Sequence, residues 1–182
     1  TGGTTFYQSD VSIVSTRFEG SRGEDALNII NSAFTLDDVT MAGTVSDALD
    51  ADFSSGSVRG GRFTDIGQAG GGDAIDISGS EVRVSGTAFA RIADKALSVG
   101  ERSTMAATGL EMADVGTGAA AKDGSSLALS ATRITAATFA GLTAYIKKPE
   151  YGPAEITARD VTVTATRTPV VAQTGSRVER DG

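Results

Sequence analysis

Apolar residues recur along the chain at a spacing much longer than one helix or strand period. The hexapeptide "DALNII" at 25–30 returns as "DALDAD" at 47–52, "DAIDIS" at 73–78 and "KALSVG" at 95–100. Weaker copies follow in "GAAAKD" at 118–123, "GLTAYI" at 141–146 and "PVVAQT" at 169–174. A constant spacing of this kind is typical of repeat proteins, in which each repeat forms one structural unit.

Two further columns of apolar residues follow the same period. The first begins a short strand after each hexapeptide and comprises Val11, Phe34, Val58, Val82, Met105, Leu127, Ile156 and Val178. The second comes five to seven residues later and comprises Phe18, Val39 or Met41, Phe63, Phe89, Leu110 or Met112, Ile134, and Val161 or Val163. Steps along the first column are 22 to 24 residues, except for one of 29 that contains "KKPEYG". We therefore expect a loop insertion near 145–153.

Within each unit the apolar residues alternate with polar ones, as in Ile75/Ile77 and Val82/Val84. A period of two indicates strands. Three short strands in roughly 23 residues predict an all-β fold, a parallel β-helix of about 7–8 coils that stack to share one core. We expect one domain over 1–182, an excerpt of a longer protein. One column admits only small side chains: Ala26, Ala48, Ala74, Ala96, Gly118 and Gly141.

The repeat pattern resembles the right-handed parallel β-helix, or pectate-lyase-like, superfamily over nearly the whole chain. The stretches "DKALSVGERS", "AAKDGSS" and "GLTAYIKKPEYGPA" are similar to β-helix segments of bacterial surface or secreted proteins. The resemblance implies a right-handed coil and an extracellular or cell-surface location.

Composition excludes several classes of function. The formal charge of −7 argues against nucleic acid and anionic membranes as partners, because both select clustered Lys and Arg. The chain has no cysteine and no histidine, which removes thiol catalysis and the commonest zinc ligand. No apolar run approaches the roughly 20 residues that span a bilayer, so we expect no membrane insertion.

Glycines at 70–72 open the stretch "GGGDAIDISGS", which fits neither of two known ligand-binding patterns. A dinucleotide fingerprint leads into a helix, whereas a strand is expected here. A calcium-binding nonapeptide carries a second glycine where Ala74 stands, and the neighbouring units lack paired glycines. We interpret this stretch as a flexible corner of one coil.

Alternation also predicts which side chains point outward. Asn28, Asp50, Asp76 and Ser98 should form one outward column, with neighbours about 4.8 Å apart. Asp50 and Asp76 are then candidate ligands of Ca²⁺. We expect instead a solvated acidic face and no cofactor, with Ca²⁺ binding as the alternative.

Arg59 and Arg83 each follow a central apolar residue, which predicts that they stack outside adjacent coils, with Arg62 nearby. In polysaccharide lyases of the superfamily that the chain resembles, calcium acidifies a uronate and an arginine or lysine abstracts the C5 proton. The resemblance makes Arg83 and Lys122 the catalytic candidates. We expect instead that these arginines form surface ion pairs.

The insertion places two aromatic rings and two cations on a loop that a proline stiffens. Binding sites on repeat scaffolds often use such insertions, and a tyrosine ring can stack on a sugar. We expect Glu101, Lys122 and Asp123 to lie beside it on neighbouring coils. The ligand-binding candidates are Tyr145, Lys147, Lys148, Tyr151, Glu101 and Asp123.

These features predict a rigid β-helix domain with a structural or glycan-binding role and a polysaccharide as partner. The alternative is a lyase or epimerase acting on an anionic polysaccharide; we expect binding rather than catalysis. A spacer without a ligand also fits the sequence. Strand edges at uncapped terminal coils predict end-to-end self-association.

Overall fold

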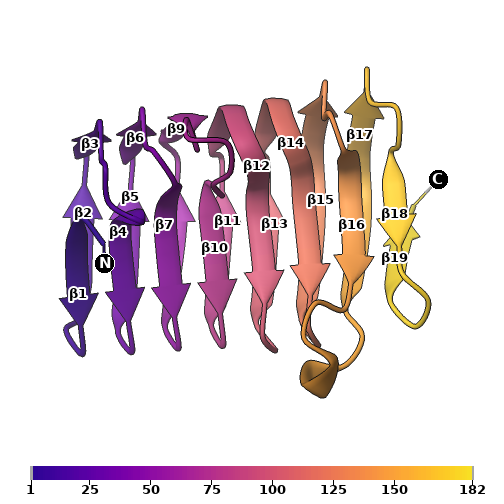
Figure 1. The fold of residues 1–182 in the computed structure, drawn as a ribbon, viewed down its shortest axis with the longest axis horizontal. Helices are drawn as coiled ribbons and strands as arrows, with labels where there is room; N and C mark the ends of the chain where they lie inside the picture. Colours follow the sequence, from indigo (N-terminus) through magenta and orange to yellow (C-terminus); the bar gives the residue numbers. More distant parts are fainter. Residues whose placement is uncertain (1, 182) are drawn as a thin grey trace.

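Eight coils stack side by side along one axis, with the two ends of the chain at opposite ends of the stack (Figure 1). The structure is a computed structural model that describes residues 2–181. All printed strand pairings are parallel, and each joins one coil to the next. The predicted all-β parallel β-helix with a period of about 23 residues is confirmed.

Three parallel sheets form the sides of the stack, and the first, sheet A, contains the repeated hexapeptide. Its strands are β1 (Thr4–Tyr7), β4 (Asp25–Ile30), β7 (Asp47–Asp52), β10 (Ile75–Ser78), the end of β12 (Ala88–Gly100), the end of β14 (Glu111–Lys122), β16 (Ala140–Tyr145) and β18 (Val170–Ala172).

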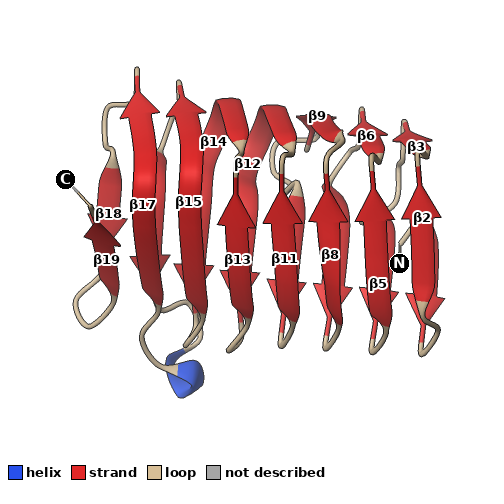
Figure 2. Cartoon of the chain, turned by 180° about the vertical axis from the view of Figure 1, so that it is seen from behind, coloured by secondary structure: helices blue, strands red, loops and turns tan. Residues whose placement is uncertain are grey.

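Sheet B lies on the opposite side and faces the viewer in Figure 2. Its strands are β2 (Val11–Val14), β5 (Ala33–Asp37), β8 (Ser55–Arg59), β11 (Glu81–Ser85), β13 (Thr104–Thr108), the start of β15 (Ser126–Thr135), the start of β17 (Glu155–Thr164) and β19 (Arg177–Arg180).

Sheet C is narrower and closes each of the first seven coils. It contains β3 (Arg17–Glu19), β6 (Thr40–Ala42), β9 (Arg62–Ile66), the starts of β12 and β14, and the ends of β15 and β17. One short 3₁₀ helix, η1 (Pro149–Tyr151), lies in the predicted loop insertion and protrudes from the stack (Figure 1).

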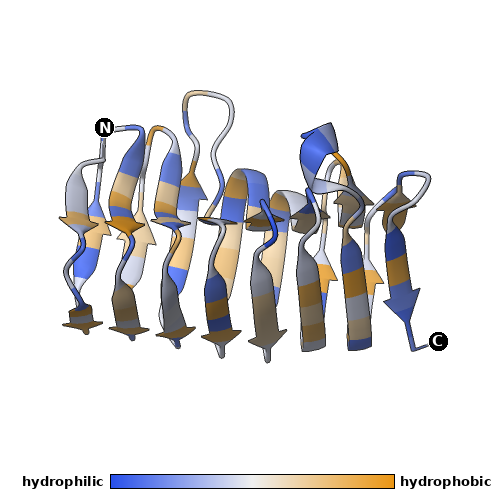
Figure 3. Ribbon diagram, turned by 90° about the horizontal axis from the view of Figure 1, so that it is seen from below, coloured by the Kyte–Doolittle hydropathy of each residue, from blue (hydrophilic) through white to orange (hydrophobic). Residues whose placement is uncertain are grey.

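The apolar side chains fill one continuous interior, because polar and apolar positions alternate along the strands (Figure 3). The sheet B column runs in register through Phe34, Val82 and Leu127, as predicted. The prediction that Val58 belongs to this column is wrong, because Val58 pairs with Leu36 and Val84, two positions further along.

The residue that stands in the column instead is Gly56. A Cβ there would lie 2.5 Å from the ring of Phe34, so the glycine makes room for the large side chain of the preceding coil. The apolar pattern cannot reveal such a position, because the position carries no apolar side chain.

The structure also decides between the alternative residues predicted for the apolar column that begins at Phe18, which lies in sheet C. One register file, meaning a column of residues that pair from each coil to the next, contains Met41, Phe63, Phe89, Met112 and Ile134. The rings of Phe63 and Phe89 stack with their centroids 5.3 Å apart. The other members of the predicted pairs, Val39, Leu110 and Val161, are buried as well but lie outside this file.

Serine side chains form a ladder at the corner between sheets A and B. The hydroxyl of each serine accepts a hydrogen bond from the backbone N–H of the serine one coil earlier, at 2.8 to 3.1 Å. Its members are Ser32, Ser54, Ser80, Ser103 and Ser125, and all of them are buried. This ladder satisfies backbone donors that a tight corner would otherwise leave unpaired.

Candidate functional site

The outward column of sheet A is the one that alternation predicts. Asn28 pairs in register with Asp50, Asp50 with Asp76, and Asp76 with Ser98. The column continues through Ala120, Thr143 and Val171 toward the C-terminal coils. Polar and acidic side chains therefore line one outer face of the stack.

Asp50 is the carboxylic acid that this face perturbs most. Burial, together with the nearby carboxylates of Asp52, Asp25 and Asp76, raises the pKa of Asp50 to about 8. The side-chain amide of Asn28 donates a hydrogen bond to Asp50 at 3.2 Å. At neutral pH Asp50 therefore holds its proton and is a hydrogen-bond donor as well as an acceptor.

Asp76 has a different partner, the ammonium group of Lys122, at 3.4 Å. Lys122 lies two coils further along the stack, so its side chain reaches back across the intervening coil. Ser98 in that coil is fully buried and its hydroxyl has no hydrogen-bond partner among the described residues. The structure thus brings together the candidates Asp50, Asp76 and Lys122.

Lys95 is a further cation on this face that sequence reasoning missed. Its ammonium group contacts Asp94 at 2.5 Å and Asp73 at 3.2 Å, and its backbone N–H donates to Asp73 at 2.9 Å. Lys95 occupies the register position of the aspartates at 47 and 73, where β12 has a bulge. The sequence signal that could have revealed this cation is the change from aspartate to lysine at the first position of "KALSVG".

A depression of about 640 Å³ lies next to this ion-pair network on the C-terminal part of the stack. Tyr145 and Phe139 supply aromatic surface to it, and Lys95, Asp94 and Gln173 supply polar groups. Phe139 is 64% exposed, an unusual position for a phenylalanine. Burial raises the pKa of the Tyr145 phenol, which keeps it a hydrogen-bond donor.

Asp123 anchors the loop insertion that follows Tyr145. One carboxylate oxygen of Asp123 accepts hydrogen bonds from the backbone N–H groups of both Lys147 and Lys148, each at 2.6 Å. The Lys148 ammonium group pairs with Glu101, which raises the pKa of that lysine. The predicted acidic neighbours of the loop therefore contact it directly.

The two tyrosines of the loop region have different surroundings. Tyr145 lies in the electrostatic field of Lys95 and Lys122 on sheet A, whereas the guanidinium group of Arg102 lies 5.5 Å from the ring centroid of Tyr151. The depression is lined by Tyr145 but not by Tyr151. Tyr145 is thus the tyrosine that a ligand in the depression would contact.

The prediction that Arg59 and Arg83 stack is wrong. Arg59 pairs in register with Ser85, and Arg83 pairs with Ser57, so the two arginines lie two positions apart along their strands. Both arginines project from sheet B, whereas the candidates Asp50 and Lys122 lie on sheet A. Arg62 lies on a third side, in sheet C. Arg59 and Arg83 form exposed ion pairs with Asp37 and Glu81.

Over residues 2–181 no three acidic side chains converge as a metal site. Asp50 and Asp76 are register neighbours, but Asp76 is already paired with Lys122 and Asp50 is protonated at neutral pH. A Ca²⁺ ion would have to displace both the ammonium group of Lys122 and the proton of Asp50.

Membrane-spanning helices are absent from residues 2–181, because no helix there is long and apolar enough to cross a bilayer.

The fold defines a parallel β-helix domain. No protein-family model matches the sequence, and no curated protein matches it. Among solved structures, the chain is similar to the catalytic domain of a GH87 alpha-1,3-glucanase in complex with nigerose, with a TM-score of 0.45 and 9% identity over 97% of this chain. A variant of that domain in complex with tetrasaccharides has a TM-score of 0.45 and 8% identity over 97% of this chain. The chain covers 49% and 50% of those structures, about half their length.

Proposed function

We propose that this domain belongs to a secreted or cell-surface protein and binds a polysaccharide on the outer face of sheet A. The depression beside Tyr145 is the observation that carries this proposal. It combines exposed aromatic surface from Phe139 with charged groups of Asp94 and Lys95 that are already held by each other.

Sugar recognition needs these two components together. The apolar face of a sugar ring packs on an aromatic side chain, and its hydroxyl groups pair with side chains held in fixed orientations. Lys95 is fixed by two carboxylates, and Gln173 is fixed by accepting a hydrogen bond from the backbone N–H of Ile146 at 2.6 Å. A ligand therefore meets a preorganised surface, which reduces the entropic cost of binding.

Replacement of the aromatic residues tests the proposal. A glycan array selects the ligand, and calorimetry then measures its Kd with the wild type, Tyr145→Ala and Phe139→Ala. We expect each variant to weaken binding about tenfold or more. Tyr145→Phe keeps the ring and should retain most of the affinity.

Phe53 offers a matched control because it is 65% exposed, nearly as much as Phe139, but does not line the depression. Phe53→Ala should leave the Kd unchanged, and the melting temperature of each variant reports whether it folds. Failure of the wild type to bind any arrayed glycan would refute the proposal and favour a spacer.

The lyase alternative now depends on Lys122 rather than Arg83. Lys122 contacts Asp76 in the register column of Asp50, whereas Arg83 lies on another sheet. Absorbance of an unsaturated product from polyuronates, followed with calcium or chelator, measures this activity. Turnover that Lys122→Met abolishes and Arg83→Gln leaves intact would replace binding by catalysis as the function of sheet A.

A further inference from the structure

Sheet B carries a separate hollow of about 690 Å³, which we call the arginine hollow. Its charged lining residues are three arginines, and none of its lining residues is a carboxylate, although the whole chain has a net charge of −7. The remaining lining residues are small or apolar: Ser57, Val84, Ser85, Ala106, Ala107, Thr108, Ala128, Leu129, Ser130 and Thr157.

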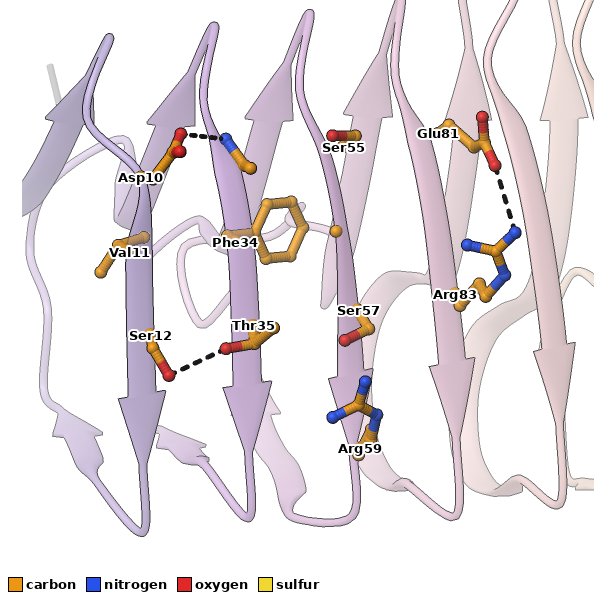
Figure 4. A pocket seen from close by; sticks show the side chains of 12 residues that line it. Asp10, Val11, Ser12, Phe34, Thr35, Ser55, Ser57, Arg59, Glu81 and Arg83 are labelled. Atoms are coloured by element: carbon orange, nitrogen blue, oxygen red, sulfur yellow. Dashed lines mark hydrogen bonds and ion pairs between the residues drawn. The ribbon is translucent and has the colours of Figure 1, made fainter.

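The strand register orders the arginines along the stack. Arg59 and Arg159 lie in one register file, separated by Ser85, Thr108 and Ser130. The two ends of this file are four coils apart, roughly 19 Å at the usual strand spacing. Arg83 lies in the adjacent file, where it pairs with Ser57, and Figure 4 shows it on the strand next to that of Arg59. The hollow is therefore elongated along the axis of the stack.

These three arginines form longer ion pairs than Arg17 and Arg91 do. Arg59, Arg83 and Arg159 contact acidic side chains at 3.3, 3.4 and 4.0 Å, each through a single nitrogen–oxygen pair among the described residues. Arg17 and Arg91 instead hold a carboxylate through two nitrogens, at 2.6 to 2.9 Å. The arginines of the hollow thus keep free N–H donors for a ligand.

The geometry points to a second binding site: we propose that the arginine hollow binds a linear acidic polysaccharide. A guanidinium group pairs with a planar carboxylate or a sulfate through two hydrogen bonds. The hydroxyl groups of Thr108 and Ser130 lie between Arg59 and Arg159. Ser130 donates a hydrogen bond to Thr108 at 2.9 Å, and the remaining donor and acceptor capacity of the two hydroxyl groups pairs with sugar hydroxyls. The lining residues include no aromatic ring on which a nucleic-acid base could stack, which disfavours single-stranded nucleic acid.

Calorimetry with two acidic glycans and one neutral glycan tests this site. The probes are oligogalacturonate, which carries carboxylates, dextran sulfate, and uncharged dextran. We expect the two acidic probes to bind and dextran not to bind. Arg83→Gln and Arg159→Gln should each weaken binding about tenfold, because each removes a charge-assisted pair. Arg83→Lys keeps the charge but loses the paired geometry, so an intermediate affinity is expected.

Arg17→Gln is the matched control, since Arg17 is also exposed but lies in sheet C and its guanidinium group is already bound to the carboxylate of Glu19. Equal weakening by Arg17→Gln would show non-specific attraction and overturn the proposal, as would absence of binding to both acidic probes. Tighter binding of a single-stranded oligonucleotide than of either glycan would also overturn it. Tyr145→Ala should have no effect, which separates this site from the one on sheet A.

Discussion

Lys122 and Asp76 are joined across two coils by an ion pair of 3.4 Å, and a glycine lies between them. A Cβ at Gly100 would lie 2.7 Å from Cε of Lys122, so the intervening coil leaves space for the lysine side chain to reach back. The side chains of Lys122 and Asp76 are only 9% and 22% exposed. This pair therefore ties three successive coils together at the centre of the sheet A face.

Removal of one partner should destabilise the fold more than removal of both. Lys122→Met leaves Asp76 without a counter-ion in a partly buried place, so we expect a loss of about 2–4 kcal/mol in the free energy of unfolding. The double variant Lys122→Met/Asp76→Leu should recover more than half of this loss. Urea denaturation of the wild type, both single variants and the double variant measures the coupling. Additive effects of the two substitutions would contradict it.

Stability should fall as the pH rises, because Asp50 holds its proton more tightly in the folded state. Its pKa is about 8 when folded, against roughly 3.9 in an unfolded chain. Between about pH 4 and pH 8 the folded state therefore binds more protons than the unfolded state. The free energy of unfolding should decrease by up to about 1.4 kcal/mol per pH unit from this group and level off above pH 8.

Two variants separate the contributions to this pH dependence. Asp50→Asn removes the titrating group and should flatten the decline up to pH 8. Asp47→Asn should flatten it only below about pH 6, since burial raises the pKa of Asp47 to about 6. Urea denaturation at each pH from 4 to 9 measures both slopes. A wild type whose stability increases across this range would show that Asp50 ionises normally.

The fold could be predicted from the sequence because its signal is repeated in every coil. Each coil buries the same positions, so the apolar columns reinforce one another, and the outward column of Asp50 and Asp76 follows from strand alternation alone. Register was predictable only where a column has large apolar residues. At Gly56 the column has no side chain, so the apolar pattern predicted Val58, two positions further along, in its place.

The same two-residue error in register explains the wrong prediction for Arg59 and Arg83, because the position of Arg59 follows from that of Val58. Other parts of the candidate site depend on contacts between non-repeated residues. Lys95 follows a bulge that the period does not encode, and Phe139 lies in a connection where apolar residues are normally ascribed to the core. Such features need the three-dimensional arrangement, since each occurs only once.

Close approach between coils at Gly118 should make this position intolerant of any side chain. A Cβ there would lie 2.5 Å from the carbonyl oxygen of Gly141 and 2.7 Å from Cδ1 of Ile134. Gly118→Ala should therefore cost about 2 kcal/mol or more through displaced backbone. Gly86→Ala is the control, because a Cβ at Gly86 meets no atom within 4 Å although the residue has φ +61°.

Melting temperatures compare the two glycine variants. Gly86→Ala should cost only the backbone strain of a left-handed position, about 1–2 kcal/mol. A loss at Gly118 no larger than that at Gly86 would mean that neighbouring coils can move apart.

Asp123 should control the mobility of the loop insertion without affecting the coils. Asp123→Ala removes the acceptor of the two hydrogen bonds from Lys147 and Lys148, so the loop from 146 to 152 should open more often. Limited trypsin digestion then cleaves after Lys147, since the proline that follows Lys148 protects the next bond. We expect cleavage of the variant to be about tenfold faster than that of the wild type.

Asp114→Ala is a matched control for this experiment, because Asp114 has φ 55° and Asp123 has φ 58°. Both substitutions impose the same backbone cost on alanine, but only Asp123 binds the loop. Faster cleavage after Lys147 in both variants would attribute the effect to general destabilisation. Faster cleavage in Asp123→Ala alone, at an unchanged rate of global unfolding, assigns loop anchoring to this carboxylate, because only local opening then exposes the bond.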